Sequence, residues 1–516
     1  MPKIVIKETA KVTAARGEYE NFTVVVLGPI NEASKIEKFD NSGVCEFTDQ
    51  TIFKDTVGLI AATTISSTAK APEEITGEGI VTYTLTDNAN DKLAFNNLAS
   101  LNGVYYLKEP KTAADTDYGY LKSTTHKYTK ITNDSEFTAG TYVMLKSEGS
   151  DVVSYSQYGN QIAYELLGLG YTVLYRAFYP SDYSESDTSD LVKALVGKNI
   201  VSMSNLGNYE KCWSLLEDKA EYDFRYALSG IIEGDVLIGE KTVSQCISAL
   251  CDKRGDCTAL IDIDASKYNG TNQVTAVNNI KESLSGVTAS EYTALFAPYV
   301  VYDMKVPSEY NSNTTFPASF HYLACAAKAF ENYREWYAVA GYTRGISKYK
   351  IVNVGCVFGE NAINTLEPRN SDNGVDKAVN LIVKIKNNFY LWGNRTAYEL
   401  VNSSSENGDL NAKHFLNIRQ LCTTIKKQVY VACRRFTFDP NSDVLWLNFC
   451  NAIKPTLEKM RADQGIEDYK LIKVKNVKKA TLQARIRIVP IEAVEDFEIE
   501  LFLENSINGT VVEEKE

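Results

Sequence analysis

With 516 residues, the chain is long enough for about three domains and a large buried core. Apolar residues make up 44% and charged residues 23%, which excludes a wholly disordered or fibrous protein. The net charge of −12 argues against general nucleic-acid binding, because such a surface repels a phosphate backbone. We therefore expect no direct nucleic-acid partner.

Targeting signals are not evident. Residues 1–8 contain no apolar core of the length that a signal peptide needs. The longest apolar stretch, 166–179, is shorter than a membrane span and carries Arg176. We therefore expect no membrane insertion. The ten cysteines are scattered through a long chain, which indicates reduced thiols in a compartment like the cytoplasm.

The first 150 residues are rich in strand patterns. Residues 4–6 and 22–27 read as strands, separated by a polar, mostly basic arm. From about residue 75 to 150, short Thr, Tyr and Val runs such as 80–85 and 103–107 alternate with turn residues. This pattern predicts a β-rich module that is inserted into a domain of a different fold.

From about residue 155 the pattern becomes an alternation of helices and strands. Strands separated by helices of this length favour an α/β layer. Ser319 is predicted to be the N-cap of a helix over 320–332, with Pro317 just before it. The predicted elements before it are helix 158–169, strand 171–175, helix 243–252, strand 257–263, helix 274–284 and strand 297–302.

The C-terminal third has the most regular periodicity. Two helices with apolar faces are predicted on either side of a break at 439–441. Pro455 predicts a bend near residue 451 of the second helix, and Gly465 is the predicted stop. Alternation over 482–488 and 497–504 predicts two strands. The apolar helix positions are Phe415, Ile418, Leu421, Cys422, Ile425, Val429 and Cys433, followed by Leu445, Phe449, Ile453, Leu457 and Met460.

Motifs for nucleotides and metals fit poorly. Residues 234–242 nearly match a phosphate-binding loop, but Glu240 separates the last Gly from the Lys. An ordinary polar turn is the favoured interpretation. Cys246, Cys251 and Cys257 lack the paired spacing and the fourth ligand of a zinc site, so buried apolar thiols are expected. No metal or cofactor is predicted.

Catalytic constellations are equally weak. The chain has three histidines, which leaves few general bases for a nucleophile. Ser319 and His321 lie two residues apart at a helix start and point in different directions. Asp262 and Asp264 at a strand end could hold a cation or form an acid/base pair, although charged residues at strand ends are common. We expect no enzyme, and keep as the alternative an α/β enzyme built around these aspartates and the 234–242 loop.

The charges near the two termini are more informative. Residues 469–490 contain seven Lys or Arg and no acid, whereas 492–516 contain nine acids and one Lys, a net charge of −8. Opposite charges on adjacent strands stabilise their pairing. The acidic strand 497–503 could accept the basic strand 485–489 on one edge and a segment such as Lys3–Lys7 on the other. That second partner comes either from the same chain or from a neighbouring subunit.

A series of short motifs follows one another between about residues 155 and 505. They are helix 158–169 with Gly170 and the strand ending at Arg176, 222–226, 254–262, 317–319, 336–341 with 344–345, 390–396, 417–419, 438–441 and Trp446. Each motif is weak individually, but in order and spacing the set resembles the contractile tail sheath proteins of bacteriophages and related injection machines. Residues 75–150 carry no such similarity.

The resemblance implies a structural polymer. Such proteins assemble as stacked six-subunit rings around a tail tube, and terminal arms complete a sheet in a neighbour's C-terminal domain. The implied partners are further copies of the chain, the tail tube protein, and baseplate and tail terminator proteins. The implied location is a virion tail that is assembled in the host cytoplasm. The linkage residues are Lys3, Ile4, Val5, Ile6, Lys7, Arg485, Arg487, Phe497, Glu498, Ile499, Glu500, Leu501 and Leu503.

We therefore predict a mixed α/β sheath-type subunit that contracts to drive a tube through a target envelope. Another self-assembling tail or baseplate component is the second alternative. The predicted segments are a linking arm (1–30), a β-rich module (31–150), an α/β core (151–360), a C-terminal domain with paired helices and a linkage sheet (361–505), and an acidic tail (506–516).

Overall fold

A computed structural model describes most of the chain. The described residues are 22–31, 34–58, 64–65, 80–87, 91, 95, 104–110, 126–131, 136–145, 155–156, 159–179, 183–202, 206–229, 237–238, 241–302, 315–367, 376–399, 410–474, 482–491 and 493. The chain divides into two compact units, residues 1–335 with 339–427 and residues 336–338 with 428–516.

The first unit is built on an eight-stranded sheet with the order β19-β18-β14-β13-β10-β1-β9-β2. The six central strands are parallel, and the two edge strands β2 and β19 run antiparallel to their neighbours. The mixed α/β class predicted from the sequence is therefore confirmed. The strands are β1 (Thr23–Pro29), β2 (Val44–Phe47), β9 (Thr172–Phe178), β10 (Tyr226–Leu228), β13 (Thr258–Asp262), β14 (Thr293–Ala297), β18 (Val379–Ile385) and β19 (Asn388–Leu391).

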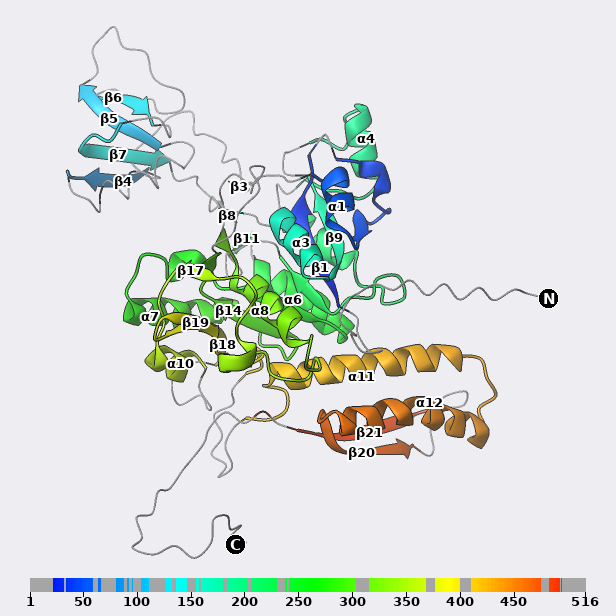
Figure 1. Cartoon of the computed structure of the whole chain (residues 1–516). Coiled ribbons are helices and arrows are strands. Elements are labelled where there is room, and N and C mark those ends of the chain that lie inside the picture. Colours follow the sequence, from blue (N-terminus) through cyan, green and yellow to red (C-terminus); the bar gives the residue numbers. More distant parts are fainter. Residues whose placement is uncertain are drawn as a thin grey trace, which may run out of the picture. The chain divides into compact units, whose positions relative to one another are not determined.

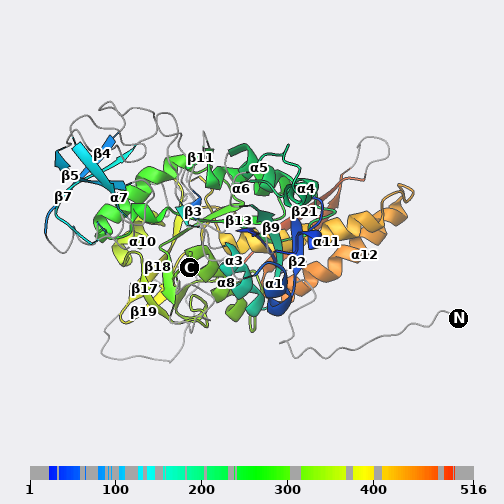
Figure 2. The same cartoon turned by 90° about the horizontal axis from the view of Figure 1, so that it is seen from above.

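Helices cover both faces of this sheet, as Figure 2 shows for α3 and α8 on one side and α5 and α6 on the other. Alternate residues of each strand point to opposite faces. Val24 and Val26 of β1 accordingly belong to one apolar core, and Val25 to the other. The helices around the sheet are α1 (Gln50–Thr56), α3 (Gly159–Gly168), α4 (Asp190–Gly197), α5 (Leu206–Ser214), α6 (Val243–Arg254), α7 (Gln273–Ser283), α8 (Ala318–Ala329), α9 (Gly341–Arg344) and α10 (Glu360–Leu366).

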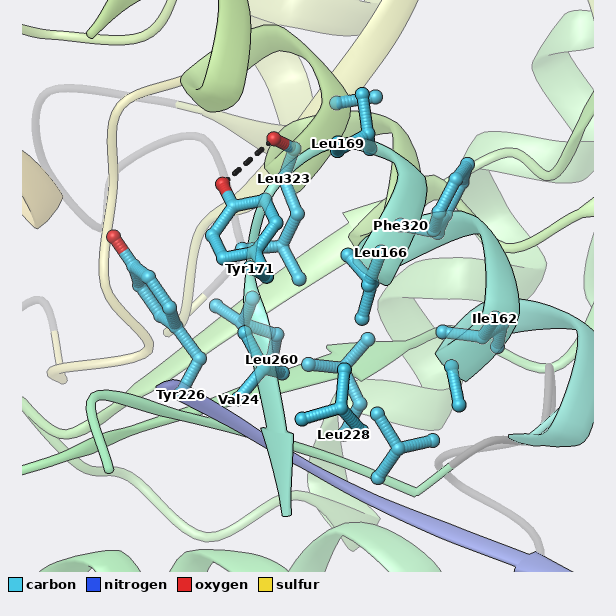
Figure 3. Packing of buried hydrophobic residues seen from close by; sticks show 14 of the residues in the cluster. Val24, Ile162, Leu166, Leu169, Tyr171, Tyr226, Leu228, Leu260, Phe320 and Leu323 are labelled. Atoms are coloured by element: carbon cyan, nitrogen blue, oxygen red, sulfur yellow. Dashed lines mark hydrogen bonds between the residues drawn. The ribbon is translucent and has the colours of Figure 1, made fainter. Parts of the chain in front are cut away.

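The core on the α3 side is drawn in Figure 3. Ile162 and Leu166 of α3 pack with Phe320 and Leu323 of α8 over the sheet residue Leu260. The buried hydroxyl of Tyr171 donates a hydrogen bond to the main-chain oxygen of Leu323 at 2.8 Å. The predicted helix 158–169 and the strand that follows it are confirmed as α3 and β9.

Two local predictions around the sheet are wrong. The expected single strand 297–302 is divided at the cis peptide bond Ala297–Pro298 into β14 and β15 (Val300–Tyr302). β15 belongs to a separate three-stranded sheet with β16 (Thr315–Phe316) and β17 (Ile351–Val354). Ser319 is not an N-cap, because α8 begins at Ala318 and its N-cap is Pro317. Ser319 instead lies inside the first turn.

Several short elements complete this part of the unit. Residues 234–242, the near match to a phosphate loop, contribute the two-residue strands β11 (Leu237–Ile238) and β12 (Lys241–Thr242). Thr242 forms a capping box with Gln245 at the start of α6, which accounts for its polar side chain in structural terms. The single-turn helices are η1 (Ile36–Lys38), η2 (Ala265–Lys267) and η3 (Leu284–Gly286).

Strands between residues 80 and 145 form a separate antiparallel sheet with the order β4-β7-β5-β6. The predicted strands 80–85 and 103–107 are confirmed as β4 and β5. Phe95 packs edge-to-face on Phe137 and on Tyr142, each at a ring-centroid distance of 5.5 Å. The strands are β4 (Ile80–Leu85), β5 (Val104–Pro110), β6 (His126–Lys130) and β7 (Gly140–Leu145), and the pair β3 (Thr64–Ile65) and β8 (Tyr155–Ser156) brackets them in sequence.

The second unit contains α12 (Asp443–Ala462), β20 (Ile466–Lys473) and β21 (Ala484–Pro490), and α11 (Leu416–Arg435) enters it from residue 428 (Figure 1). The predicted inner positions of α12 are confirmed, because all five are buried. Cys433, predicted on the apolar face of α11, is exposed. Gly465 is not the helix stop, because Gln464 before it takes the left-handed conformation, with φ of 58°. No helix in the described part of the chain is both long and apolar enough to cross a membrane.

Candidate assembly interface

The antiparallel pair β20–β21 has two distinct faces. Directly opposed residues lie on the same face of a sheet, and the faces alternate along each strand. The inner face consists of Tyr469, Leu471 and Lys473 with Ala484, Ile486 and Ile488. The outer face consists of Asp468, Lys470 and Ile472 with Arg485, Arg487 and Val489.

Two polar contacts orient the inner face toward α12. The hydroxyl of Tyr469 donates to Glu458 Oε1 at 2.5 Å, and Lys473 Nζ donates to Asp443 Oδ1 at 2.7 Å. Burial and then the Glu458 hydrogen bond raise the pKa of Tyr469 to about 12. The hydrogen bond and the positive charge of Lys473 lower the pKa of Asp443. The register of the sheet on α12 is thus held at both ends of the helix.

The inner face is covered only in part. Leu471, Ile486 and Ile488 remain half-buried, although α12 lies against β20. On α12 itself, Phe449, Ile453 and Leu457 are buried. The apolar surface that stays exposed therefore belongs to the strands and not to α12. A further strand beside β20 or β21 would extend this apolar face and cover its edge.

The outer face is basic. Lys470 and Arg487 lie directly opposite each other, Arg485 lies opposite Ile472, and all three cations are exposed. Among the described residues no carboxylate forms an ion pair with any of the three. Like charges that face each other across a pair of strands repel, so this arrangement costs free energy in the isolated subunit.

The edges of the pair are the second feature of the site. Within the described residues, β20 and β21 are bonded to each other and to no other strand. The outward N–H and C=O groups of such edges are a template for a further strand. The site therefore offers main-chain hydrogen bonds, a partly covered apolar face, and an outer face with three cations and one carboxylate, Asp468, to an extended segment.

The turn that leads from α12 into β20 is fixed by an aromatic side chain from elsewhere in the second unit. Trp336 Nε1 donates to the main-chain oxygen of Asp463 at 3.1 Å, and the Tyr337 hydroxyl donates to Gln464 Oε1 at 3.1 Å. A Cβ placed on Gly465 would lie 2.9 Å from the indole ring. The absence of a side chain at residue 465 is thus required by the position of Trp336.

Of the predicted linkage residues, Arg485 and Arg487 lie where the sequence places them, in a strand with their side chains on its exposed face. The other predicted linkage residues, in 3–7 and 497–503, lie outside the described residues. The pattern of alternation identified β21. It could not identify Lys470 as the partner of Arg487, because the register between two strands is not visible in either strand alone.

The motifs that carry the sheath resemblance are used in packing. Arg225 is buried, with a guanidinium nitrogen 3.7 Å from the Glu335 carboxylate and 2.7 Å from Thr424 Oγ1. Arg254 stacks on Phe224 at 4.2 Å and donates to the main-chain oxygen of Leu216 at 2.8 Å. Both arginines connect elements of the first unit.

Arg395 of the Trp-Gly-Asn-Arg-Thr stretch is buried in the same way. Its guanidinium lies over the ring of Phe415 at 4.7 Å, and its main-chain N–H donates to Asn380 Oδ1 at 2.7 Å. Gly393 packs against Asn380, where a Cβ would come within 2.5 Å. The residues of this motif therefore serve the packing of the fold.

The aspartates of the enzyme alternative have separate structural roles. Asp262 is buried, and its carboxylate accepts hydrogen bonds from the main-chain N–H of Ser319 at 2.9 Å and from the Ser319 hydroxyl. Burial raises the pKa of Asp262 to about 7, against the effect of these hydrogen bonds. Asp264 caps η2 through Ser266. Asp262 thus caps α8, a role that the sequence analysis gave to Ser319.

His321 and the clustered cysteines are also buried. His321 Nδ1 is hydrogen-bonded to the Tyr302 hydroxyl at 2.7 Å, and burial lowers the pKa of His321 to about 3. Cys251 and Cys257 have their sulfur atoms 3.5 Å apart. Burial, and then the neighbouring thiol, raise the pKa of Cys251. The prediction of buried thiols is confirmed.

No family model matches the chain, and no curated protein matches it. Similar solved structures include the anti-feeding prophage baseplate, with 13% identity, 70% of this chain and 84% of that chain covered, and a TM-score of 0.44. A second is the PVC sheath complex of an extracellular contractile injection system in the contracted state. It has 11% identity, covers 98% of both chains and has a TM-score of 0.47.

A third similar structure is the sheath tail protein from Desulfitobacterium hafniense. It has 9% identity, covers 95% of this chain and 100% of that chain, and has a TM-score of 0.38. Two of these three structures are named as sheath proteins, and the other is named as a baseplate.

Proposed function

We propose that this chain is the structural subunit of a contractile sheath. In this proposal it polymerises as stacked six-subunit rings around a tail tube and contracts to drive the tube through a target envelope. The supporting observation is the incomplete sheet of the second unit. Its edges are open among the described strands, its inner face is partly covered, and its outer face is basic.

The sequence supplies segments that match this sheet. Residues 497–501 alternate apolar and acidic side chains and are followed by Phe502 and Leu503, and residues 3–7 alternate Lys or Val with Ile. An added strand is held mainly by main-chain hydrogen bonds, and its alternate side chains fill one face. We infer that terminal segments of neighbouring copies join the β20–β21 sheet and link the subunits into a mesh.

The buried arginine networks support a mechanical role for the body of the subunit. Arg225 and Arg254 connect strands, helices and loops that are far apart in sequence, within the first unit. A body that is tied together in this way can rotate as a rigid object while its terminal segments act as joints. The remaining proposed partners are the tail tube, baseplate and tail terminator proteins, and the proposed location is a virion tail.

Electron microscopy of the purified full-length protein tests the proposal. We expect hollow tubes of stacked rings when the protein is concentrated, and a dependence of their formation on salt, because charged faces meet. Protein that stays monomeric over a wide range of concentration and salt would contradict the sheath role. As a matched control, Lys350→Glu combined with Lys386→Glu changes two exposed cations of the first unit and should leave the tubes intact.

A further inference from the structure

The basic outer face of β20–β21 decides which strand can join the sheet (Figure 1 shows the two strands beside α12). We propose that Lys470, Arg485 and Arg487 select the acidic strand 497–503 of a second copy of this chain and reject the basic segment 3–7 from the edge of β21. This inference rests on the proposed function and names the residues that determine the order of its strands.

A strand added beside β21 places alternate residues on the outer and inner faces of the sheet. In one register, Glu498 and Glu500 lie on the outer face near Arg485 and Arg487. The same register places Phe497, Ile499 and Leu501 on the inner face, near the half-buried Ile486 and Ile488. A slip by one residue would reverse both matches, so charge and apolar pattern specify the same register.

The basic segment 3–7 is the strand that would compete for the same edge. Residues 3–7 would place Lys3, Val5 and Lys7 on one face and Ile4 and Ile6 on the other. With the isoleucines on the inner face, both lysines would lie beside Arg485 and Arg487. Like charges that face each other across strands repel. The outer face therefore disfavours the basic segment until an acidic strand has been added.

Lys470 and Arg487 form a like-charge pair across the two strands. These side chains are directly opposed and exposed, and no carboxylate in the described part of the chain forms an ion pair with them. The pair destabilises the free subunit and is compensated when acidic residues are added beside it.

This arrangement makes an unusual prediction for Lys470→Glu. The substitution turns a repulsive cross-strand pair into an attractive one, so the melting temperature of the free subunit should rise. The same change draws Arg487 into an ion pair within the subunit and puts a carboxylate one strand away from the edge that the acidic strand joins, so the subunit concentration needed for tubes should rise by about fivefold. A purely structural role for Lys470 would move stability and assembly in the same direction.

Two double charge-reversal variants identify which strand joins the sheet and which copy of the chain supplies it. The face-reversed variant carries Lys470→Glu and Arg487→Glu, and the strand-reversed variant carries Glu498→Lys and Glu500→Lys. We expect neither to form tubes alone, and we expect an equal mixture of the two to form them. A chain that carries all four substitutions should also form them. Circular dichroism melting of each variant reports whether it is folded.

Each other outcome has a defined meaning. Normal tubes from the face-reversed variant alone would overturn the proposal. Recovery by the four-substitution chain without recovery by the mixture would assign the acidic strand to its own copy, and would overturn the neighbour's role. If the wild type forms no tubes, the proposed function fails. Strand selection by the basic outer face is then tested by the binding of a synthetic peptide of residues 494–506. Equal binding to wild-type and face-reversed protein would overturn this selection.

Discussion

The indole Nε1 of Trp336 donates a hydrogen bond to the main-chain oxygen of Asp463, at 3.1 Å. The bond joins two parts of the second unit that are 127 residues apart in sequence. It also explains why residue 465 has no side chain, because the ring occupies the place of a Cβ. The turn between α12 and β20 is therefore determined by a residue that no local pattern could have indicated.

Gly465→Ala should destabilise the second unit. The added Cβ would lie 2.9 Å from the rigid indole ring of Trp336, so the ring or the backbone must shift. Overpacking of this kind costs roughly 1–3 kcal/mol. Urea unfolding followed by tryptophan fluorescence measures the loss. Gly197→Ala, where a Cβ has no neighbour within 4 Å, is the control and should change the free energy of unfolding far less.

The carboxyl group of Asp262 should make stability fall as the pH rises. Burial raises its pKa in the folded protein to about 7, whereas an unfolded Asp titrates near 3.9. The folded state therefore holds the proton more tightly. This stabilisation is complete below about pH 4 and is lost as the pH rises through about 7, which amounts to roughly 4 kcal/mol at most.

Asp262→Asn should remove this contribution. Urea titration from pH 4 to 8 measures the free energy of unfolding of both proteins. As the pH rises, the wild type should lose stability relative to the variant. Asp264→Asn is the control, since its carboxylate caps η2 and is partly exposed. A constant difference across this pH range for Asp262→Asn would show that the buried carboxyl group keeps an ordinary pKa.

The parts of the fold that the sequence predicted best are those set by periodicity. The five apolar positions of α12 are spaced by three or four residues, and all are buried, because one helical face meets a sheet. Periodicity predicted the structure less well where a regular element ends. The predicted strand 297–302 extended across Pro298, although Val300 pairs in a different sheet from Ala297.

The parts that the sequence could not predict depend on contacts across long separations. Asp262 caps α8 from a strand that lies 57 residues earlier, so the cap was assigned to the nearby Ser319. The opposition of Lys470 and Arg487 needs the register of two strands, and composition alone showed only that the region is basic. A local pattern predicts which elements form, whereas the site is made by their pairing.

The β-rich module should be removable. Thr64 and Ile65 pair with Ser156 and Tyr155, so the chain enters and leaves residues 66–154 at two adjacent strands. The strands β4 to β7 pair only with one another among the described residues. Replacement of residues 66–154 by a short Asn-Gly turn should therefore leave the first unit folded, with a melting temperature within a few degrees of the wild type.

Calorimetry of the shortened chain checks this prediction. Its control is an equally short replacement for residues 206–214, which would remove α5 and with it Tyr209, Cys212 and Trp213 from the core. That control should not fold. Loss of cooperative unfolding in the shortened chain would show that the module contributes to the core of the first unit.

Deletion of residues 1–16 should separate folding from assembly. If this segment links neighbouring subunits, its removal takes few contacts from its own subunit, and the melting temperature should change little. Polymerisation should be lost, because a joint of the mesh is missing. The measurement is a comparison of thermal melting with tube formation in the microscope.

A matched variant with Lys3→Ser and Lys7→Ser keeps the length and the apolar residues Ile4 and Ile6. It should still polymerise, but more weakly, if charge adds to the main-chain pairing. Normal tubes from the deleted chain would show that the N-terminal segment is not a linker, whereas a large fall in melting temperature would assign it to the subunit's own core.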